Sequence, residues 1–164
     1  MSKILLLFLV VSLSPLTMEA QSSDKIKVLK FDDLNTLLHK DNDTTYIINF
    51  WATWCKPCIE ELPAFERINK EYANEKVKVL LVSLDFKSAI EKRVVPFVEK
   101  NNIQSEVIAL NESNPNTYIS KVSESWTGAI PATLIYNKNN RAFYEKSFTY
   151  EELKNTINSK LKTQ

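Results

Sequence analysis

One segment in the first half of the chain constrains the fold more than any other, because it joins a strand-like run to a helix-like run through two cysteines. Residues 44–50 are rich in β-branched and aromatic side chains, which is typical of a buried strand. After Cys55 and Cys58, apolar residues recur every three or four positions up to Tyr72, which predicts an amphipathic helix with Pro57 in its first turn. The two cysteines are therefore expected where a strand ends and a helix begins.

Strand-like and helix-like segments alternate along the remainder of the chain. We expect further strands at about 26–31, 77–84, 106–110, 132–137 and 142–148. We expect further helices at about 32–38, with Asp32 as the cap, at 88–101, at 114–122 and from Thr149 to about 161. Alternating strands and helices that end in a hairpin and a helix predict an α/β fold with three layers and a mixed sheet.

Two pairs of side chains have the spacing of a capping box, in which a hydroxyl and a carboxylate satisfy backbone N–H groups at a helix start. Ser88 with Glu91 predicts the start of one helix, and Thr149 with Glu152 predicts the start of the last. Pro96 lacks a backbone N–H, so we expect it to bend or divide the first of these two helices.

The first twenty residues differ in composition from the rest of the chain. Lys3 provides a positive charge, residues 4–13 are almost wholly apolar, and Ala20 supplies a small residue before a cut. This pattern predicts a secretory signal at 1–20, followed by a single domain at 21–164. The apolar run is about half the length needed to cross a bilayer, which favours a cleaved signal over a membrane anchor.

The chain has only two cysteines, and this limits the chemistry that they support. A structural zinc site needs four ligands, and haem attachment needs a histidine after the second cysteine. The one histidine is His39, and Ile59 follows Cys58. A disulfide across so short a loop adds little stability in the chain-entropy model. A redox pair is the favoured interpretation, while a two-thiolate copper(I) site stays open.

The position at a helix start gives the two sulfurs different roles. Unpaired backbone N–H groups and the positive end of the helix dipole favour a thiolate at Cys55, and Lys56 adds a positive charge beside it. We therefore expect Cys55 to attack, and Cys58, one turn further along, to resolve the mixed disulfide. The residues between the cysteines, Lys56 and Pro57, also tune the redox potential.

Two stretches of the sequence resemble a known family. The run from Asn49 to Cys58, NFWATWCKPC, resembles the active-site signature of thioredoxin-like proteins. Its continuation, IEELP, is similar to the exported TlpA/ResA branch, which includes cytochrome c maturation thioredoxins. The run from Trp126 to Thr133, WTGAIPAT, resembles the family's second motif. The resemblance spans Phe31 to the C-terminus.

The resemblance implies a thioredoxin fold, with three α/β/α layers around a central mixed sheet and a helix-strand insertion before the strand that carries a cis-proline. It makes Cys55 the nucleophile and Cys58 the resolving thiol. It makes Pro131 the cis-proline that faces the disulfide, and it implies that the backbone of Ile130 pairs with a substrate chain. The insertion lies between Asp85 and Pro131, where we expect it to influence the choice of partner.

Two positions bear on proton transfer. Where thioredoxin has a buried aspartate, six residues before the first cysteine, this chain has Asn49, which cannot act as a base. Glu61, six residues after Cys55, matches an acidic residue that members of the branch place near the disulfide. Partial burial would raise the pKa of Glu61 and let it accept the Cys58 proton, whereas the alternative is a solvated glutamate on the helix surface.

Three further side chains are candidates for a role near the disulfide. Trp54 and Trp51 either line a substrate groove or belong to the core, and Trp54 is the stronger candidate for substrate contact. Gly128 is the only glycine in the chain. Its place three residues before Pro131 indicates a backbone shape or a close approach that a side chain would block. His39 receives no role.

A Lys-Pro pair between the cysteines resembles the reducing members of the family. The predicted function is therefore that of an enzyme, a thiol-disulfide oxidoreductase that reduces protein disulfides, with cytochrome c maturation as one setting. We expect an exported protein, periplasmic in a Gram-negative cell, that receives electrons from a membrane protein. The alternatives are a copper(I) carrier, a module whose disulfide regulates association, and a peroxidase. No cofactor or oligomer is indicated, and 21 basic against 20 acidic residues do not favour nucleic acid.

Overall fold

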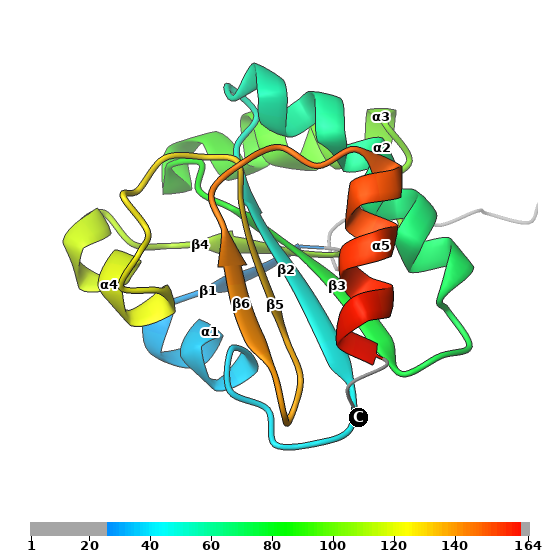
Figure 1. Cartoon of the computed structure of the whole chain (residues 1–164). Coiled ribbons are helices and arrows are strands. Elements are labelled where there is room, and N and C mark those ends of the chain that lie inside the picture. Colours follow the sequence, from blue (N-terminus) through cyan, green and yellow to red (C-terminus); the bar gives the residue numbers. More distant parts are fainter. Residues whose placement is uncertain (1–25, 162–164) are drawn as a thin grey trace, which may run out of the picture.

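The computed structural model describes residues 26–161, which form one sheet with helices on both of its faces (Figure 1). The strands are β1 (Ile26–Leu29), β2 (Thr45–Trp51), β3 (Val77–Ser83), β4 (Glu106–Leu110), β5 (Ala132–Tyr136) and β6 (Arg141–Tyr144). Their order across the six-stranded sheet is β1-β4-β3-β2-β5-β6. The first four in that order are parallel, while β5 is antiparallel to β2 and to β6. The predicted mixed sheet is confirmed.

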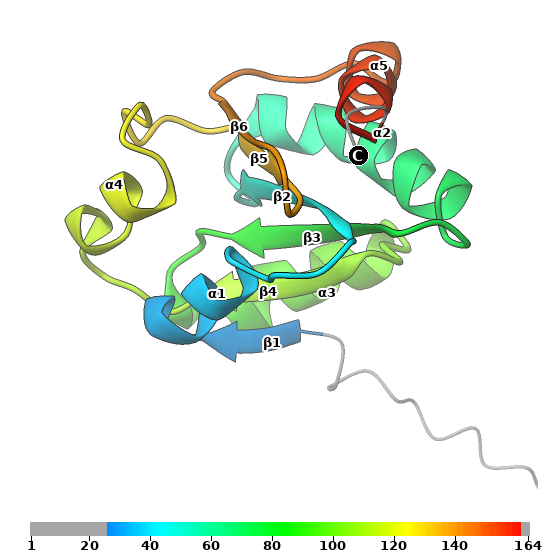
Figure 2. The ribbon, with the colours of Figure 1, turned by 60° about the horizontal axis from the view of Figure 1, so that its bottom comes forward.

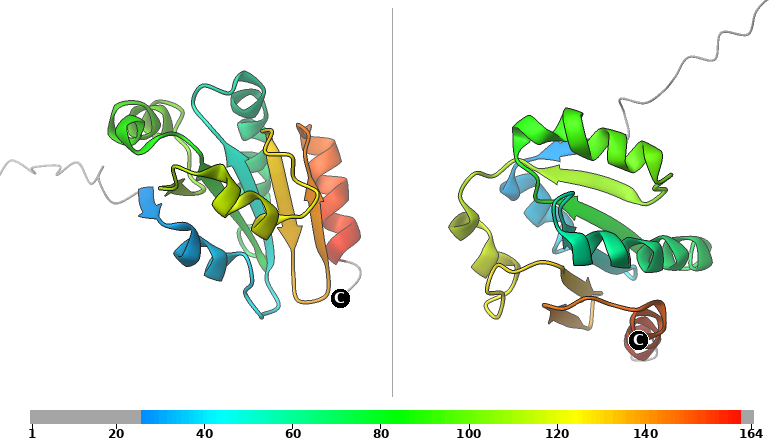
Figure 3. Two further views of the ribbon diagram at one scale, coloured as in Figure 1. Left: turned by 90° about the vertical axis from the view of Figure 1, so that its left-hand side faces the viewer. Right: turned by 90° about the horizontal axis from the view of Figure 1, so that it is seen from above.

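Two core clusters, one on each face of the sheet, produce the three layers (Figures 2 and 3). The helices are α1 (Phe31–Leu37), α2 (Lys56–Glu71), α3 (Val95–Lys100), α4 (Ile119–Val122) and α5 (Tyr150–Leu161). Apolar side chains of α2, α3 and α5 pack on one face, and those of α1 and α4 on the other. Each large apolar side chain buried in this way contributes roughly 1.5–3 kcal/mol relative to an exposed one. The thioredoxin-like, three-layer α/β/α fold is confirmed.

Strand β2 contributes side chains to the core clusters on both faces of the sheet. All of its residues are buried, and successive side chains point to opposite faces. Ile47 belongs to the cluster under α2, while Ile48 and Phe50 belong to the cluster under α1. The strand reads as a nearly continuous apolar run because it lies between β3 and β5 and is covered on both faces.

Helix α2 begins directly after Cys55, which is its N-cap. Pro57 occupies the first turn, where a missing backbone N–H leaves no helical hydrogen bond unmade. The helix continues past Pro63 and buries Leu62 and Phe65 against the sheet. The expected junction, with the two cysteines between a strand and a helix, is confirmed.

The segment after β3 differs from the single helix expected at 88–101. It consists of a 3-10 turn at Lys87–Ala89, a π-helical turn at Ile90–Val94 and then α3. Pro96 lies in the first turn of α3, so the division expected at this proline is confirmed, since its missing N–H interrupts the hydrogen-bond ladder. The predicted capping box of Ser88 and Glu91 is wrong, because both residues lie inside turns whose N-caps make no side-chain hydrogen bond.

The first and last helices start in different ways. Asp32 is not the cap of α1, because it lies inside the first turn. The backbone N–H of Phe31 instead donates to the carboxylate of Glu112 at 3.1 Å, a contact between residues 81 positions apart. Helix α5 starts as predicted, because Thr149 and Glu152 exchange hydrogen bonds in a capping box.

Three other elements are shorter than the sequence pattern predicted. Strand β1 ends at Leu29 and β6 at Tyr144, and the helix expected at 114–122 divides into a 3-10 turn at Pro115–Thr117 and α4. Within residues 26–161, no helix is both long enough and apolar enough to cross a membrane. The signal expected at 1–20, with its alternative as an anchor through 4–13, lies outside the described residues.

Candidate active site

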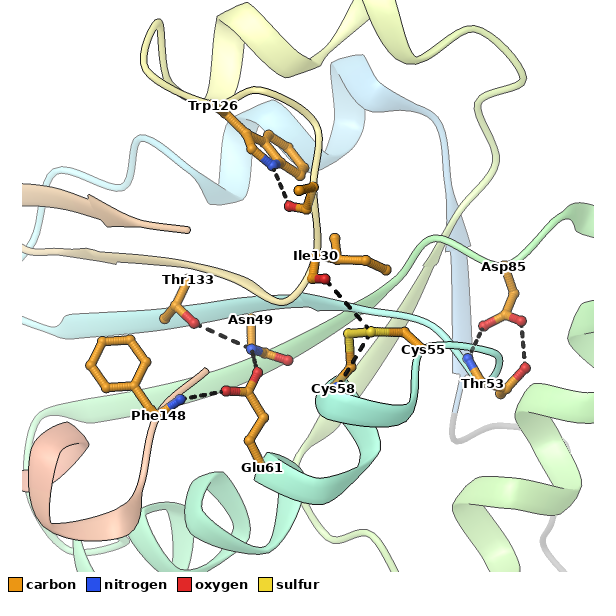
Figure 4. The surroundings of a disulfide bond; sticks show 11 residues. Asn49, Thr53, Cys55, Cys58, Glu61, Asp85, Trp126, Ile130, Thr133 and Phe148 are labelled. Carbon is orange, nitrogen blue, oxygen red and sulfur yellow. Dashed lines mark hydrogen bonds between the residues drawn. A yellow bond between two sulfur atoms is a disulfide. The ribbon is translucent and has the colours of Figure 1, made fainter. Parts of the chain in front are cut away.

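Cys55 and Cys58 are joined by a disulfide with an S–S distance of 2.03 Å, at the junction of β2 and α2 (Figure 4). Cys55 is 6% exposed, whereas Cys58 is fully buried. The backbone N–H of Cys58 points to Cys55 Sγ at 3.3 Å. A negative charge on Cys55 would be stabilised by this N–H and by the helix dipole. The accessible sulfur is therefore also the one at which the helix favours a thiolate.

The segment before β5 forms the second wall of the site. The peptide bond between Ile130 and Pro131 is cis, as the resemblance implied. Cys55 Sγ lies 3.8 Å from the carbonyl oxygen of Ile130, so the disulfide faces this segment (Figure 4). The indole N–H of Trp126 donates to the carbonyl oxygen of Ala129 at 2.8 Å, which holds the approach to Ile130 against the core.

Glu145, directly after β6, holds the same segment through a second set of contacts. Its carboxylate accepts hydrogen bonds from the backbone N–H groups of Thr127 at 3.0 Å and Ala129 at 3.1 Å, and from the Thr127 hydroxyl. The bonds from Thr127 lower the pKa of Glu145 because they favour its ionised form. No sequence pattern indicates this contact, which joins two segments 16 to 18 positions apart in the chain.

Gly128 lies within this segment and has a φ of 97°, a conformation that residues with a side chain rarely adopt. A Cβ at this position would lie 2.9 Å from Cδ1 of Ile119 in α4. Both of the features predicted for the only glycine, a special backbone shape and a close approach, are therefore present.

Glu61 points into the protein and is 4% exposed, so its interpretation as a solvated surface glutamate is wrong. Asn49 Nδ2 donates to its Oε1 at 2.7 Å, and the backbone N–H of Phe148 donates to its Oε2 at 2.7 Å. Burial raises the pKa of Glu61 to about 7, and the two hydrogen bonds offset only part of that rise. A carboxyl group with this pKa takes up and releases a proton near neutral pH.

Asn49 lies fully buried in β2, where it orients Glu61 (Figure 4). Its Nδ2 also donates to the hydroxyl of Thr133 in β5 at 3.2 Å. Its Oδ1 has no hydrogen-bond partner among residues 26–161. The amide therefore uses its donors to place the neighbouring carboxylate and keeps a free acceptor in the interior.

A second buried carboxylate, Asp85, follows β3 and is 2% exposed. Thr53 donates to it twice, from the backbone N–H at 2.8 Å and from the hydroxyl at 2.6 Å, and Ser83 donates from its hydroxyl at 2.9 Å. These bonds tie the turn before Cys55 to the end of β3 (Figure 4). Sequence reasoning missed Asp85. The available signal was that the carboxyl ends of neighbouring parallel strands meet at one edge of a sheet.

The two tryptophans near the cysteines have different environments. Trp54 is 59% exposed beside Cys55 and is available to a partner. Trp51 is fully buried and packs on Phe97 with ring centroids 5.2 Å apart, so it belongs to the core and does not line a groove. Phe86, which the sequence analysis did not single out, is 74% exposed directly after Asp85.

Three other predicted contact residues lie at the surface around Cys55. Lys56 and Pro57 are exposed in the first turn of α2, and Ile130 is half-buried across from them. Lys56 Nζ lies 3.7 Å from a carboxylate oxygen of Glu60, one turn further along the helix. An exposed pair of this kind is worth little in stability, so Lys56 is free to meet a partner.

No group of three or more His, Cys, Asp or Glu side chains within residues 26–161 is placed to hold a metal ion. His39 is exposed, away from the disulfide. Its Nδ1 lies 3.0 Å from the carbonyl oxygen of Asn35.

The strand order, the cis-proline and the disulfide at a helix start define a thioredoxin-fold protein with a Cys-X-X-Cys site. Comparison with known proteins leads to the same group. The chain belongs to the AhpC/TSA family, whose profile matches residues 20–142.

Individual relatives refine this assignment. The thioredoxin-like protein YneN of Bacillus subtilis is 40% identical, over 44% of this chain and 48% of its own length. The thiol-disulfide oxidoreductase ResA of Geobacillus thermodenitrificans is 27% identical, over 68% of this chain and 60% of its own. The chain thus spans about half the length of these curated relatives. The resemblance to the TlpA/ResA branch is confirmed.

A solved structure shows the same fold. The thiol:disulfide interchange protein of Chlorobium tepidum superposes with a TM-score of 0.60 at 19% identity, covering 72% of this chain and 80% of that one.

Proposed function

We propose that this protein is a thiol-disulfide oxidoreductase that reduces protein disulfides. The observation that carries the proposal is the disulfide between Cys55 and Cys58 at the start of α2, with the more accessible sulfur 3.8 Å from the carbonyl oxygen before a cis-proline. A relative named a thiol-disulfide oxidoreductase supports it. The Lys-Pro pair between the cysteines, which resembles the reducing members of the family, supports the direction of electron flow.

The reaction consists of two exchanges between sulfurs. The Cys55 thiolate attacks one sulfur of the substrate disulfide, forms a mixed disulfide, and releases the other substrate sulfur as a thiolate that takes up a proton. The Cys58 thiolate then attacks Cys55 Sγ, forms the disulfide seen here, and releases the second substrate thiol. Two electrons pass from the protein dithiol to the substrate disulfide.

Glu61 supplies a base for the second exchange. Cys58 is buried, so its thiol has no direct route to bulk water for its proton. Glu61 lies one turn further along the same helix, and burial brings its pKa to about 7. An ionised Glu61 accepts the Cys58 proton as the sulfur attacks, directly or through one water.

The substrate chain lies along the surface between α2 and the cis-proline segment. The backbone of Ile130 is the edge with which an extended chain would pair, as the family resemblance implies. Around it, Trp54, Lys56 and Pro57 are exposed and available to contact the residues that flank the substrate cysteine.

The proposal includes export of the domain at 21–164. The composition of residues 1–20 and the resemblance to the exported branch support this location. An exported reductant must regain two electrons after each cycle, so a membrane electron donor is part of the proposal. Cytochrome c maturation is one setting that fits a ResA-like protein.

Reduction of insulin by dithiothreitol tests the function. The protein is expected to accelerate this reaction, and Cys55→Ser is expected to lower the rate at least about 100-fold because the attacking sulfur is lost. Cys58→Ser should retain the first exchange and accumulate a mixed disulfide with insulin, detectable by mass spectrometry.

A wild-type protein no faster than Cys55→Ser would overturn the proposal. Stoichiometric retention of copper(I) without insulin reduction would then favour the carrier. Faster consumption of hydrogen peroxide than of insulin would favour a peroxidase.

A further inference from the structure

The β2–β3 ladder ends where the active-site turn begins. Its last bond runs from the N–H of Leu84 to the carbonyl oxygen of Trp51 at 2.8 Å. Beyond this point no strand within residues 26–161 pairs with the turn, and the Asp85 carboxylate accepts hydrogen bonds from both the backbone N–H and the hydroxyl of Thr53. The Asp85 side chain thus supplies the hydrogen-bond acceptors that a neighbouring strand would supply to the residues before Cys55.

The Asp85 carboxylate is surrounded by uncharged donors. The three bonds that it accepts come from one backbone N–H and two hydroxyls, on Thr53 and Ser83. None of the ion pairs within residues 26–161 includes Asp85. In all three hydrogen bonds the carboxylate oxygens of Asp85 are the acceptors. A buried negative charge without a cation acts on its neighbours with little screening.

The attacking sulfur lies within reach of this charge. Cys55 follows Thr53 by two residues, which is at most roughly 7 Å of chain. Figure 4 shows the Asp85 carboxylate directly above Thr53, with Cys55 to the left of Thr53. At an effective dielectric constant of about 20, a unit charge at roughly 10 Å changes an acid dissociation constant by roughly tenfold. A negative charge at such a distance would oppose the thiolate that the helix N-terminus favours.

Other charged groups near Cys55 are fixed or solvated. Lys56 and Glu60 pair with each other on the surface of α2, and Lys87 is exposed beyond Asp85. Glu61 lies on the inner side of α2, and Glu145 binds the segment before the cis-proline. Substitution at Asp85 leaves all of these groups in place.

We propose that Asp85 is a positioning residue that fixes the turn before Cys55 and whose buried negative charge opposes ionisation of the Cys55 thiol. The inference rests on the proposed function, in which Cys55 is the attacking sulfur. A less stable thiolate favours the disulfide form, which lowers the reduction potential and suits a reductant.

Asp85→Asn separates the charge from the geometry. The asparagine oxygen still accepts from the Thr53 N–H, and its amide donates to the Thr53 hydroxyl, so the turn keeps its bonds without the charge. Thr53→Val is the matched control, because it removes one of these bonds and leaves the charge in place. The readout is the midpoint pH at which iodoacetamide alkylates Cys55 in the reduced full-length protein, followed by mass spectrometry.

We expect Asp85→Asn to lower this midpoint by about one pH unit, and Thr53→Val to leave it unchanged. Asp85→Ala, which removes charge and bonds together, should slow mixed-disulfide formation with insulin at least about tenfold at a pH above all midpoints. An unmoved midpoint in Asp85→Asn overturns the proposal, as does an Asp85→Ala protein that reacts at the wild-type rate.

If circular dichroism shows that Asp85→Ala does not fold, the Asp85→Asn midpoint alone decides the proposal. Alkylation needs no disulfide substrate, so this result is independent of whether the protein reduces insulin.

Discussion

The two sides of the disulfide carry a buried carboxylate each, but the two groups are bound differently. On the inner side, beside Cys58, Glu61 accepts two hydrogen bonds, from a side-chain amide and a backbone N–H. On the outer side, before Cys55, Asp85 accepts three, two of them from hydroxyl groups. Burial is almost equal, at 4% and 2% exposure. The two carboxylates therefore differ in the number and kind of their donors, and burial brings the pKa of Glu61 to about 7.

This difference matches the different needs of the two sulfurs. Cys58 is enclosed and must pass its proton to a neighbour, so a base with a pKa near 7 is useful beside it. Cys55 reaches solvent and must be presented at a fixed angle to a partner, so an anchor for its turn is useful there.

The largest difference between the two carboxylates is expected when Glu61, on the inner side of the disulfide, is replaced. In Glu61→Gln the decay of the mixed disulfide with insulin should slow by about 100-fold at pH 8, because no base receives the Cys58 proton. In the wild type this rate should rise through a pH of about 7 as Glu61 ionises, and in the variant that rise should be absent. Stopped-flow measurement of product release from pH 5 to 9 tests this, and equal profiles for the two proteins would remove Glu61 from the mechanism.

The next effect concerns stability. Because the folded-state pKa of Glu61 lies above its ordinary value, ionisation on unfolding makes the folded state less stable as pH rises from about 4.5 to about 7. Glu61→Gln should lack this loss, so the free energies of unfolding of variant and wild type should diverge by about 3 kcal/mol between pH 4.5 and pH 8. Asn49 has a free Oδ1 that can turn to accept from the new amide, so the packing should be kept. Urea unfolding measures the difference, and a constant difference across this range would contradict the assigned pKa.

The smallest effect is expected at the outer rim. Trp54→Ala should lower kcat/KM for insulin by about 3- to 10-fold through KM, since it removes exposed aromatic surface beside Cys55. Val28→Ala is the matched control, because Val28 is also exposed, at 45%, but lies on the edge strand β1. The reduction of oxidised glutathione should change little in either variant. Equal losses in both variants would show that Trp54 makes no specific contact.

Much of the site could be predicted because its residues lie close together in the sequence or within motifs. The spacing of the cysteines, the strand before them and the helix after them placed Cys55 and Cys58, and the second motif placed Pro131. Glu61 followed from the family resemblance, in which an acidic residue six positions after the first cysteine lies near the disulfide. Trp51 remained ambiguous because its burial depends on α3, which contributes Phe97.

The features that escaped prediction depend on contacts between distant segments. Asp85 meets Thr53 across 32 residues, only because β2 and β3 pair in a register that sets Trp51 opposite Ser83. The start of α1 is satisfied by Glu112, which a local capping rule cannot anticipate. Such contacts are fixed by tertiary packing, which overrides local preference.

The hydrogen bond from the backbone N–H of Phe148 to Glu61 couples a residue near the C-terminal helix to the protonation state of the redox site. The donor is a backbone amide 87 residues away, two positions before α5, and its acceptor gains or loses a proton near neutral pH. Protonation of Glu61 therefore changes the electronic environment of the Phe148 amide nitrogen and its proton, which lie outside the cysteine motif. The Phe148 amide is a built-in spectroscopic reporter of the proton on which the second exchange depends.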